Sequence, residues 1–329
     1  MKAIIYDTYG PTDVLRCEEI EKPEPRDHEV LIKVRAAAVN PLDWHFMRGS
    51  PSFVRLFTGL LKPKSQRMGA DVSGLVEAAG RNVTQLKPGD AVFGTCRGAF
   101  AEYACAPEST LARNPQDVTF EQAASAPIAG LTALQALRDK VHVEPGQRVL
   151  INGAAGGVGT FAVQMAKCFG AEVTGVCNSR NVEMILSLGA DHVIDYTHED
   201  VTQGDRRYDA ILECVGNHPF SVCRRILTPT GIYVGVGGGG PDTSSMALLA
   251  GMLKNTAVSW FASQKMAGIL AKSNPADLNT IGELMQAGKV KPVIDRRYSL
   301  NEVPEAIRYL EKGHARGKVV ISVWPESAP

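Results

Sequence analysis

The amino-acid sequence predicts an α/β protein in which a doubly wound parallel sheet is joined to a β-rich domain. Between residues 148 and 236, short apolar strands alternate with helical segments, which is the rhythm of a parallel sheet covered by helices on both faces. Before residue 121, strand-like segments are separated by Gly and Pro turns, and helical periodicity is sparse. With 329 residues, of which 44% are hydrophobic and 21% charged, the chain has room for two globular domains.

The β-rich domain is expected to span residues 1–121. The sequence Leu86-Lys87-Pro88-Gly89-Asp90 predicts a tight turn that leads into one of its strands. The expected strands are residues 2–6, 29–38, 68–79, 90–94 and 100–106.

The parallel-sheet domain is expected to span residues 122–261. It opens with a helical segment at 121–138 that is broken around Pro127 to Gly130. Right-handed crossovers between successive parallel strands then produce a doubly wound sheet. The expected strands are residues 149–151, 172–177, 193–196, 208–215 and 231–236, and the expected helices are 160–169, 182–188 and 220–227.

Residues 262–329 form a third segment. Helical patterns at 276–287 and 302–310 precede a strand pattern at 318–323. The C-terminus could therefore return to complete the first domain.

A glycine-rich turn at residues 153–159 lies between an apolar strand and a helix. In the register Gly-x-Gly-x-x-Gly, Ala154 takes the first place, whereas Gly153, Gly156 and Gly159 recur at a spacing of three. A turn of this kind lets the backbone approach a pyrophosphate, and the helix N-terminus favours the anion. The alternative is a turn that binds nothing, which the alternating strands around it disfavour. We therefore expect residues Ala155, Gly156, Gly157 and Val158 to hold a dinucleotide.

The second strand of this domain ends Cys177-Asn178-Ser179-Arg180, and no carboxylate follows until Glu183. A site for NAD usually carries an acidic residue there, which binds the ribose 2′-OH. Ser179 and Arg180 suit a 2′-phosphate instead, because a guanidinium binds phosphate through two parallel hydrogen bonds. The expected cofactor is NADPH, although Arg180 could also be a solvated helix residue. Tyr196 is expected at the adenosine end, or else it is a structural strand tyrosine.

Carboxyl ends of parallel strands line the ligand crevice of such a sheet. Val215 and Gly216 end the fourth expected strand, and Val236 and Gly237 end the fifth. These residues are expected to approach the ribose-nicotinamide half of the cofactor.

Composition excludes several partners. Lys and Arg equal Asp and Glu at 35 each, without a long block of one sign, which argues against nucleic acid and anionic membranes. The N-terminal sequence does not resemble a signal peptide, and no apolar run is long enough to span a bilayer, so we expect a cytoplasmic protein without membrane insertion. The seven cysteines contain no Cys-x-x-Cys pair, which disfavours disulfides and a structural zinc site. A reactive thiol among them remains open.

Several short motifs extend the pattern over the whole chain. Besides the glycine turn they are Val39-Asn40-Pro41-Leu42-Asp43-Trp44, Gly69-Ala70-Asp71-Val72-Ser73-Gly74, Lys87-Pro88-Gly89-Asp90, Gly130-Leu131-Thr132-Ala133, Leu188-Gly189-Ala190-Asp191 and His314-Ala315-Arg316-Gly317-Lys318. The set resembles the zinc-independent medium-chain dehydrogenases/reductases, which include quinone oxidoreductases and alkenal reductases. The resemblance implies a GroES-like catalytic domain, completed by the C-terminal segment, around a Rossmann domain, with the substrate in the cleft between them. It also implies a homodimer.

The resemblance further implies that no metal is bound. Zinc members of the superfamily have a cysteine at the position of Asn40 and a His-Glu pair at the positions of Ala70 and Asp71. They also carry a four-cysteine lobe, where this chain has only Cys96 and Cys105. A catalytic zinc needs three protein ligands and a structural one usually needs four. We therefore expect no zinc and no alcohol oxidation, and instead hydride addition to an activated alkene or a quinone.

Candidate catalytic residues follow the strand at 29–38. The amide of Asn40 can donate to a carbonyl oxygen, and Asp43 could support it or relay a proton. The alternatives are a turn before Pro41 for Asn40, and a helix N-cap or a buried structural carboxylate for Asp43.

Two more residues are assigned by the resemblance alone. It implies that Thr132 contacts the nicotinamide carboxamide and that Lys318 returns near the cofactor. The alternatives are a hydroxyl at a helix N-terminus for Thr132 and an exposed strand lysine for Lys318. Residues 49–67, with several apolar side chains, are expected to cap the substrate or to form a packed surface helix.

The function expected from these residues is a metal-independent, NADPH-dependent reductase. Its substrate would be a small-molecule quinone or the alkene of an α,β-unsaturated carbonyl. The alternative is an NADPH-binding partner or sensor protein with little turnover, and a zinc alcohol dehydrogenase is a third possibility.

Overall fold

The computed structural model describes residues 1–236 and 263–324. The chain divides into two compact units. Unit 1 comprises residues 1–131, 272–288 and 292–329, and unit 2 comprises residues 132–271 and 289–291. The first boundary falls within helix α4 (Pro127–Gln135), somewhat later in the chain than the sequence predicted.

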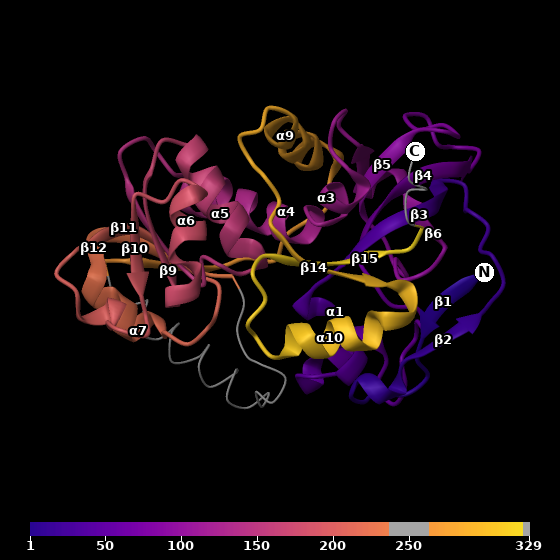
Figure 1. Ribbon diagram of the computed structural model, residues 1–329, viewed down its shortest axis with the longest axis horizontal. Coiled ribbons are helices and arrows are strands. Elements are labelled where there is room, and N and C mark those ends of the chain that lie inside the picture. The colour runs from indigo at the N-terminus through magenta and orange to yellow at the C-terminus, as the bar shows by residue number, and fades with distance from the viewer. Residues whose placement is uncertain (237–262, 325–329) are drawn as a thin grey trace. The chain divides into compact units, whose positions relative to one another are not determined.

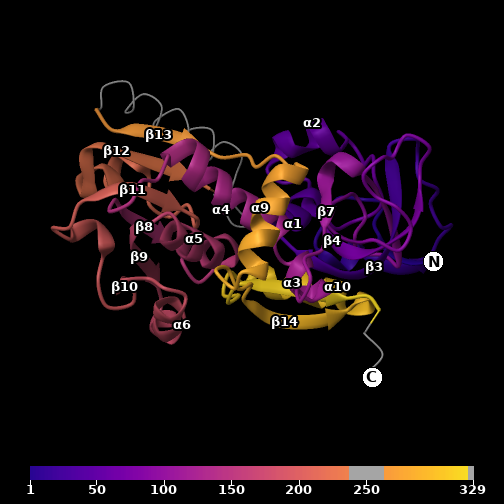
Figure 2. The same ribbon diagram turned by 90° about the horizontal axis from the view of Figure 1, so that it is seen from above.

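Unit 2 contains a six-stranded sheet in the order β10-β9-β8-β11-β12-β13, in which every pair is parallel. The chain enters at β8, moves outward through β9 and β10, and returns to the other side of β8 as β11 (Figure 2). The direction therefore reverses between β8 and β11, which is the switch point where doubly wound sheets bind ligands. The strands are β8 (Arg148–Asn152), β9 (Glu172–Cys177), β10 (His192–Asp195), β11 (Tyr208–Glu213), β12 (Leu227–Gly235) and β13 (Lys265–Gly268).

Continuous apolar strands explain why helices cover this sheet. Val149, Leu150 and Ile151 are all buried, as expected for a strand with both faces covered. Helix α5 (Gly157–Cys168) packs on β8 and β9, and α6 (Val182–Ser187) packs on β10. The remaining helical elements are η4 (Ala136–Val141), η5 (Ser179–Asn181), η6 (Val201–Gln203), α7 (Phe220–Cys223) and η7 (Arg224–Ile226).

Unit 1 is the β-rich part of the chain, with a two-stranded and a seven-stranded sheet. Its C-terminal strand β15 pairs antiparallel with β3, so residues 319–322 lie opposite residues 36–39 (Figure 1). The strands are β1 (Lys2–Ile5), β2 (Arg16–Glu19), β3 (Glu29–Val39), β4 (Asp71–Ala79), β5 (Ala91–Thr95), β6 (Tyr103–Pro107), β7 (Leu111–Arg113), β14 (Ile294–Ser299) and β15 (Lys318–Ser322).

The helices of unit 1 pack against these strands. Apolar residues of β3, β4 and β15 share one core with Trp44 and Met47 of α1 and with Val303 and Ile307 of α10. The sequence did not predict α1, although Asn40, Pro41 and Asp43 are typical of a helix start. The helical elements are α1 (Pro41–Arg48), α2 (Arg55–Thr58), α3 (Phe120–Ala124), α9 (Pro275–Gln286), α10 (Val303–Glu311), η1 (Thr12–Val14), η2 (Ser52–Val54), η3 (Glu108–Thr110) and η8 (Leu300–Glu302).

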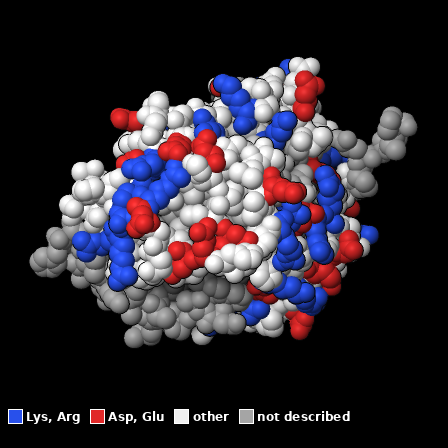
Figure 3. Space-filling model, turned by 60° about the vertical axis from the view of Figure 1, so that its left-hand side comes forward, with Lys and Arg blue, Asp and Glu red and all other residues white. Residues whose placement is uncertain are grey.

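Charged side chains of both signs are intermingled on the face shown in Figure 3, in keeping with a formal net charge of zero. A face of this kind lacks the extended positive potential that attracts nucleic acids. None of the helices in the described part of the chain is long and apolar enough to cross a bilayer.

Candidate functional site

The glycine turn joins β8 to α5 at the switch point of the unit 2 sheet. Gly153 has φ +78°, which favours glycine, and Gly156 is the N-cap of α5. A Cβ on Gly159 would lie 2.2 Å from the carbonyl oxygen of Gly153, so only glycine lets the helix begin so close to the turn. The first N–H groups of α5 have no acceptor inside the helix, and the helix dipole adds positive potential. The turn therefore fits an anion such as a pyrophosphate.

Two neighbouring strand ends bring further predicted residues to the same edge of the sheet. Ser179 and Arg180 follow β9, and Tyr196 follows β10, where its N–H donates to the Cys177 carbonyl at 3.0 Å. Ser179 and Arg180 are exposed, and the Tyr196 residue is 55% exposed. Within the described residues, Arg180 forms no ion pair. Its guanidinium is therefore available to an external anion.

Asp195 is a residue of this edge that the sequence reasoning missed. Its carboxylate accepts hydrogen bonds from the Ser179 hydroxyl and, at 2.9 Å, from the Thr197 N–H, and it lies 3.0 Å from His198 Nδ1. The hydrogen bonds from Ser179 and Thr197 hold the pKa of Asp195 below its usual range. A carboxylate thus lies beside Ser179, although none occurs at the end of β9 itself. It reaches Ser179 from the next strand, so a search limited to the β9 terminus could not find it.

A second missed residue is Glu213, a buried carboxylate at the end of β11. Its Oε1 accepts the N–H groups of Val215 and Gly216 at 3.0 and 2.8 Å, and Asn152 Nδ2 donates to both of its oxygens. The Glu213 carbonyl accepts the Val236 N–H at 3.0 Å. Glu213 therefore holds the predicted residues at the ends of β11 and β12 beside the glycine turn. Their neighbour Gly237 lies outside the described residues.

In unit 1, the predicted residues Asn40 and Lys318 meet Asp71 in a buried polar cluster. Lys318 Nζ lies 2.5 Å from Asn40 Oδ1 and 3.3 Å from both Asp71 Oδ2 and the Val39 carbonyl oxygen. Asn40 Nδ2 donates to Asp71 Oδ2 at 2.9 Å and to the Ala38 carbonyl at 3.2 Å. These residues come from the end of β3 and the starts of β4 and β15, three neighbouring strands. We call Asn40, Asp71 and Lys318 the lysine cluster.

Burial governs the electrostatics of the lysine cluster. It raises the pKa of Asp71, while the Lys318 ammonium and the Asn40 amide oppose that rise. Burial also raises the pKa of the nearby Asp43 to about 7, against the opposing hydrogen bond from the Asn40 N–H, which Asp43 Oδ2 accepts at 2.8 Å. Asp43 lies in the first turn of α1, so this bond also fixes the start of the helix.

Every polar hydrogen of the lysine cluster has an acceptor inside unit 1. The two amide hydrogens of Asn40 and the three ammonium hydrogens of Lys318 match the acceptors given above. Donation from Asn40 to a substrate, or from Lys318 to a cofactor, would require one of these bonds to break. Both assignments therefore stay predictions. The predicted residue Thr132 is also buried, in α4.

The donor set of the lysine cluster does not suit a metal ion. An ammonium group at its centre repels a cation and already uses the oxygens that could ligate one. Among the described residues, no group of three or more His, Cys, Asp and Glu side chains gathers in a way that could hold a metal.

The segment 49–67, expected to cap the substrate, exposes several apolar side chains around η2 and α2. Exposed aliphatic and aromatic groups of this kind favour apolar ligands. The side chains are Phe53, Leu56, Leu60 and Leu61.

Comparison with known proteins places the chain in a family. Residues 26–116 match the model "Alcohol dehydrogenase GroES-like domain", and residues 188–321 match "Zinc-binding dehydrogenase". The chloroplastic quinone-oxidoreductase QR1 of Triphysaria versicolor is 35% identical over 98% of each chain. The 2-methylene-furan-3-one reductase of Solanum lycopersicum is 34% identical over 99% of this chain and 80% of its own length.

Solved structures give the same result. The quinone oxidoreductase from Coxiella burnetii superposes with a TM-score of 0.84 at 34% identity, covering 98% of this chain and 99% of its own. A mycobacterial protein complexed with NADPH superposes with a TM-score of 0.80 at 28% identity, covering 98% of this chain and 100% of its own. The predicted fold, a GroES-like domain with a parallel-sheet Rossmann domain, is confirmed. The chain therefore belongs to the quinone oxidoreductase group of the medium-chain dehydrogenases/reductases.

Proposed function

We propose that this chain is a metal-independent, NADPH-dependent reductase that acts on a quinone or on the alkene of an α,β-unsaturated carbonyl. The observation that carries the proposal is the glycine turn at the switch point of the unit 2 sheet, with the exposed Arg180 on the neighbouring strand end. Relatives named as quinone oxidoreductases and as a furanone reductase support the two substrate classes.

In the proposed complex, different residues hold the pyrophosphate and the adenosine end of NADPH. Backbone N–H groups of Ala155 to Val158 hold the pyrophosphate, and Arg180 with Ser179 holds the 2′-phosphate. Asp195 opposes a 2′-phosphate by charge, but its oxygens are already engaged by Ser179, Thr197 and His198. Tyr196 lies along the adenosine, and the complex of a relative with NADPH supports this choice of cofactor.

The second half concerns the reacting end. NADPH, when bound, supplies a hydride, so that substrate, NADPH and one proton give the reduced substrate and NADP⁺. Thr132, Val215, Gly216 and Val236 position the nicotinamide, and Glu213 holds the strand ends that carry the last three. Solvent supplies the proton.

The lysine cluster supports metal independence. In the proposed enzyme, the Lys318 ammonium holds the side chains of Asn40 and Asp71, so no metal ion is needed to hold them. Asp43 fixes the start of α1. Substrate binding then relies on the exposed apolar side chains of segment 49–67, and the reaction relies on how the substrate is positioned against the nicotinamide.

A homodimer and a cytoplasmic location stay predictions, and the named plant relative QR1 is chloroplastic.

One observation favours the alternative, an NADPH-binding partner or sensor protein. The hydrogen bonds of Asn40 and Lys318 are all used inside unit 1, which leaves neither side chain free to polarise a substrate. Such a protein would bind NADPH without oxidising it.

The test follows cofactor absorbance after the protein is mixed with NADPH and either 1,4-benzoquinone or methyl vinyl ketone. We expect oxidation above the protein-free rate with at least one acceptor class, and slower oxidation of NADH. No oxidation across a broad panel of quinones and enones, together with tight NADPH binding, would instead establish the alternative.

A further inference from the structure

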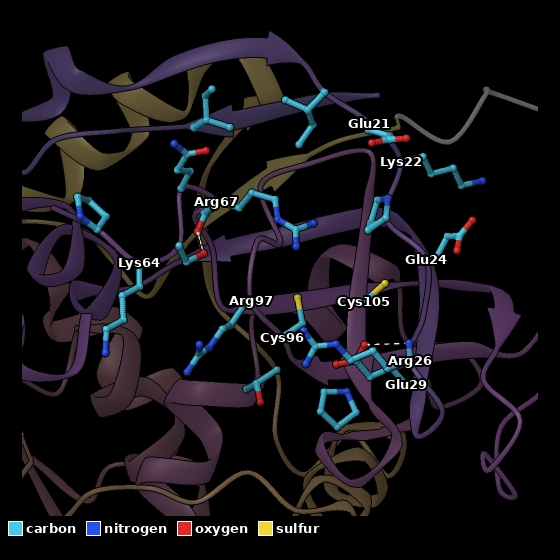
Figure 4. Close-up of a pocket in the computed structure, with 18 of the residues that line it drawn as sticks. Glu21, Lys22, Glu24, Arg26, Glu29, Lys64, Arg67, Cys96, Arg97 and Cys105 are labelled. Atoms are coloured by element: carbon cyan, nitrogen blue, oxygen red, sulfur yellow. Dashed lines mark hydrogen bonds between the residues drawn. The ribbon is translucent and has the colours of Figure 1, made fainter. Parts of the chain in front are cut away.

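Unit 1 contains a cavity of about 1580 Å³, and residues 62–67 of the segment expected to cap the substrate form part of its lining. It lies among the N-terminal strand, the loop after β2, the segment before β4 and the turn after β5 (Figure 4). Small-molecule sites usually measure some 300–1,000 Å³, so this cavity can hold a ligand of metabolite size.

Six Lys and Arg side chains line the cavity, against four carboxylates. Lys22 is paired with Glu77 at 2.8 Å, outside the cavity lining. The other five form no ion pair with any residue in the described ranges. The lining cations are Lys22, Arg26, Lys62, Lys64, Arg67 and Arg97, and the lining carboxylates are Asp7, Glu21, Glu24 and Glu29.

Two of the four carboxylates already have donors. Asp7 is paired with Arg16 and accepts Gln66 Nε2 at 2.7 Å, and Glu29 accepts the Arg26 backbone N–H at 3.1 Å. Lys22 and Asp7 are paired with residues outside the lining, which leaves five cations against three carboxylates in the walls. The cavity therefore keeps an excess of positive charge.

Arg26 and Arg67 extend into the cavity from opposite sides, toward the sulfur atoms of Cys96 and Cys105 (Figure 4). Both arginines favour the thiolate of Cys105, and Arg67 also favours that of Cys96. Burial nevertheless raises the pKa of Cys105 to about 11 and raises that of Cys96 as well. Both thiols are therefore neutral at pH 7 and supply no counter-ion.

The backbone holds Arg67 in place before any ligand arrives. It forms a β-bridge with Ile5, and the turn that follows Cys96 packs against it. In that turn Gly98 has φ +88°, and its N–H donates to Gly69 at 3.0 Å. A Cβ on Gly98 would lie 2.9 Å from the Arg67 Cβ, so this close approach needs glycine.

We propose that this cavity binds a small organic anion, whose carboxylate or phosphate group is held between the guanidinium groups of Arg26 and Arg67. Each guanidinium offers a planar pair of donors that matches such an oxyanion. Arg26 is exposed and Arg67 is half-buried, so a small molecule can reach both guanidinium groups. The lining lies wholly in unit 1, and the binding test below needs neither NADPH nor turnover.

Isothermal titration of the full chain with citrate and, separately, with inorganic phosphate at low salt tests the proposal. We expect saturable binding of at least one probe, and the tighter probe distinguishes carboxylate from phosphate. Arg26→Gln/Arg67→Gln should weaken that binding at least tenfold. A control with the same charge change at exposed positions, Arg225→Gln/Lys312→Gln, should change it less than twofold.

A second variant guards against misfolding. Arg67→Lys keeps the charge but removes the planar fork, and it should weaken binding severalfold while the circular dichroism spectrum stays that of the wild type. Absence of saturable binding to the wild type overturns the proposal. So does an equal loss of affinity in the control variant, because the effect would then be one of overall charge.

Discussion

Replacing Lys318 with methionine is the most demanding test of the lysine cluster. The Lys318 and Asp71 residues are 2% and 0% exposed, and the two charged groups lie 3.3 Å apart. Without the ammonium, the Asp71 carboxylate stays buried, and the donors left to it among the described residues are the Asn40 amide and the Ile128 N–H. Removing one partner of a buried ion pair destabilises a protein by about 3–5 kcal/mol, because an uncompensated charge remains. We expect Lys318→Met to lose that amount at pH 7.

Urea unfolding provides the assay, with tryptophan fluorescence as a probe, to which Trp44 contributes from the buried core of the same unit. The variant should regain stability as the pH falls, since an unpaired buried carboxyl binds its proton more strongly in the folded state than in the unfolded one. Asp71→Asn/Lys318→Met removes both charges and should recover more than half of the loss. If the single variant loses less than about 1 kcal/mol, or the double variant loses as much as the single one, the pairing does not stabilise the fold as argued.

Three further predictions concern single positions. Burial raises the pKa of the Asp43 carboxyl to about 7, and Asp43→Asn removes this carboxyl. The folded wild type keeps this proton to near pH 7 and the unfolded chain loses it near pH 4. Urea unfolding should therefore show the wild type losing about 3 kcal/mol relative to the variant between pH 5 and 8, and a constant difference would refute the shift. Arg180→Gln should raise the KM for NADPH roughly 10- to 100-fold and leave the KM for NADH unchanged. The control variant Arg225→Gln should leave both KM values unchanged. Gly159→Ala should destabilise by about 1–3 kcal/mol and weaken NADPH binding. Gly204→Ala, whose Cβ would meet its nearest atom at 3.6 Å, should do neither.

Local patterns explain what the sequence could predict of the fold. The strand, glycine turn and helix around residues 149–168 are contiguous in the sequence. The strand is buried on both faces, so its residues form an unbroken apolar run. Strand β14 carries Asp295, Arg296 and Arg297 at the edge of its sheet, without an apolar alternation, so no strand signal arises there. Helix α1 spans eight residues, too few for a clear helical period.

The candidate sites show where sequence reasoning ends. Ser179 and Arg180 follow one strand, so their proximity to the glycine turn could be inferred from the order of elements. Asp195 reaches Ser179 from the adjacent strand, and Lys318 lies 278 positions from Asn40 and 247 from Asp71. Contacts of this kind depend on strand order and register, which no local pattern specifies. The same holds for Arg26 and Arg67 in the cavity of unit 1.

The central claim is that this chain reduces a quinone or an enone with NADPH and without a metal. The most direct measurement is the rate of NADPH oxidation by 1,4-benzoquinone or methyl vinyl ketone, with protein dialysed against a strong chelator. We predict a rate above the protein-free background that the chelator leaves unchanged and that falls when NADH replaces NADPH. Loss of the rate on chelation and its return with zinc would contradict metal independence. Tight binding of NADPH without any oxidation would contradict the reductase itself.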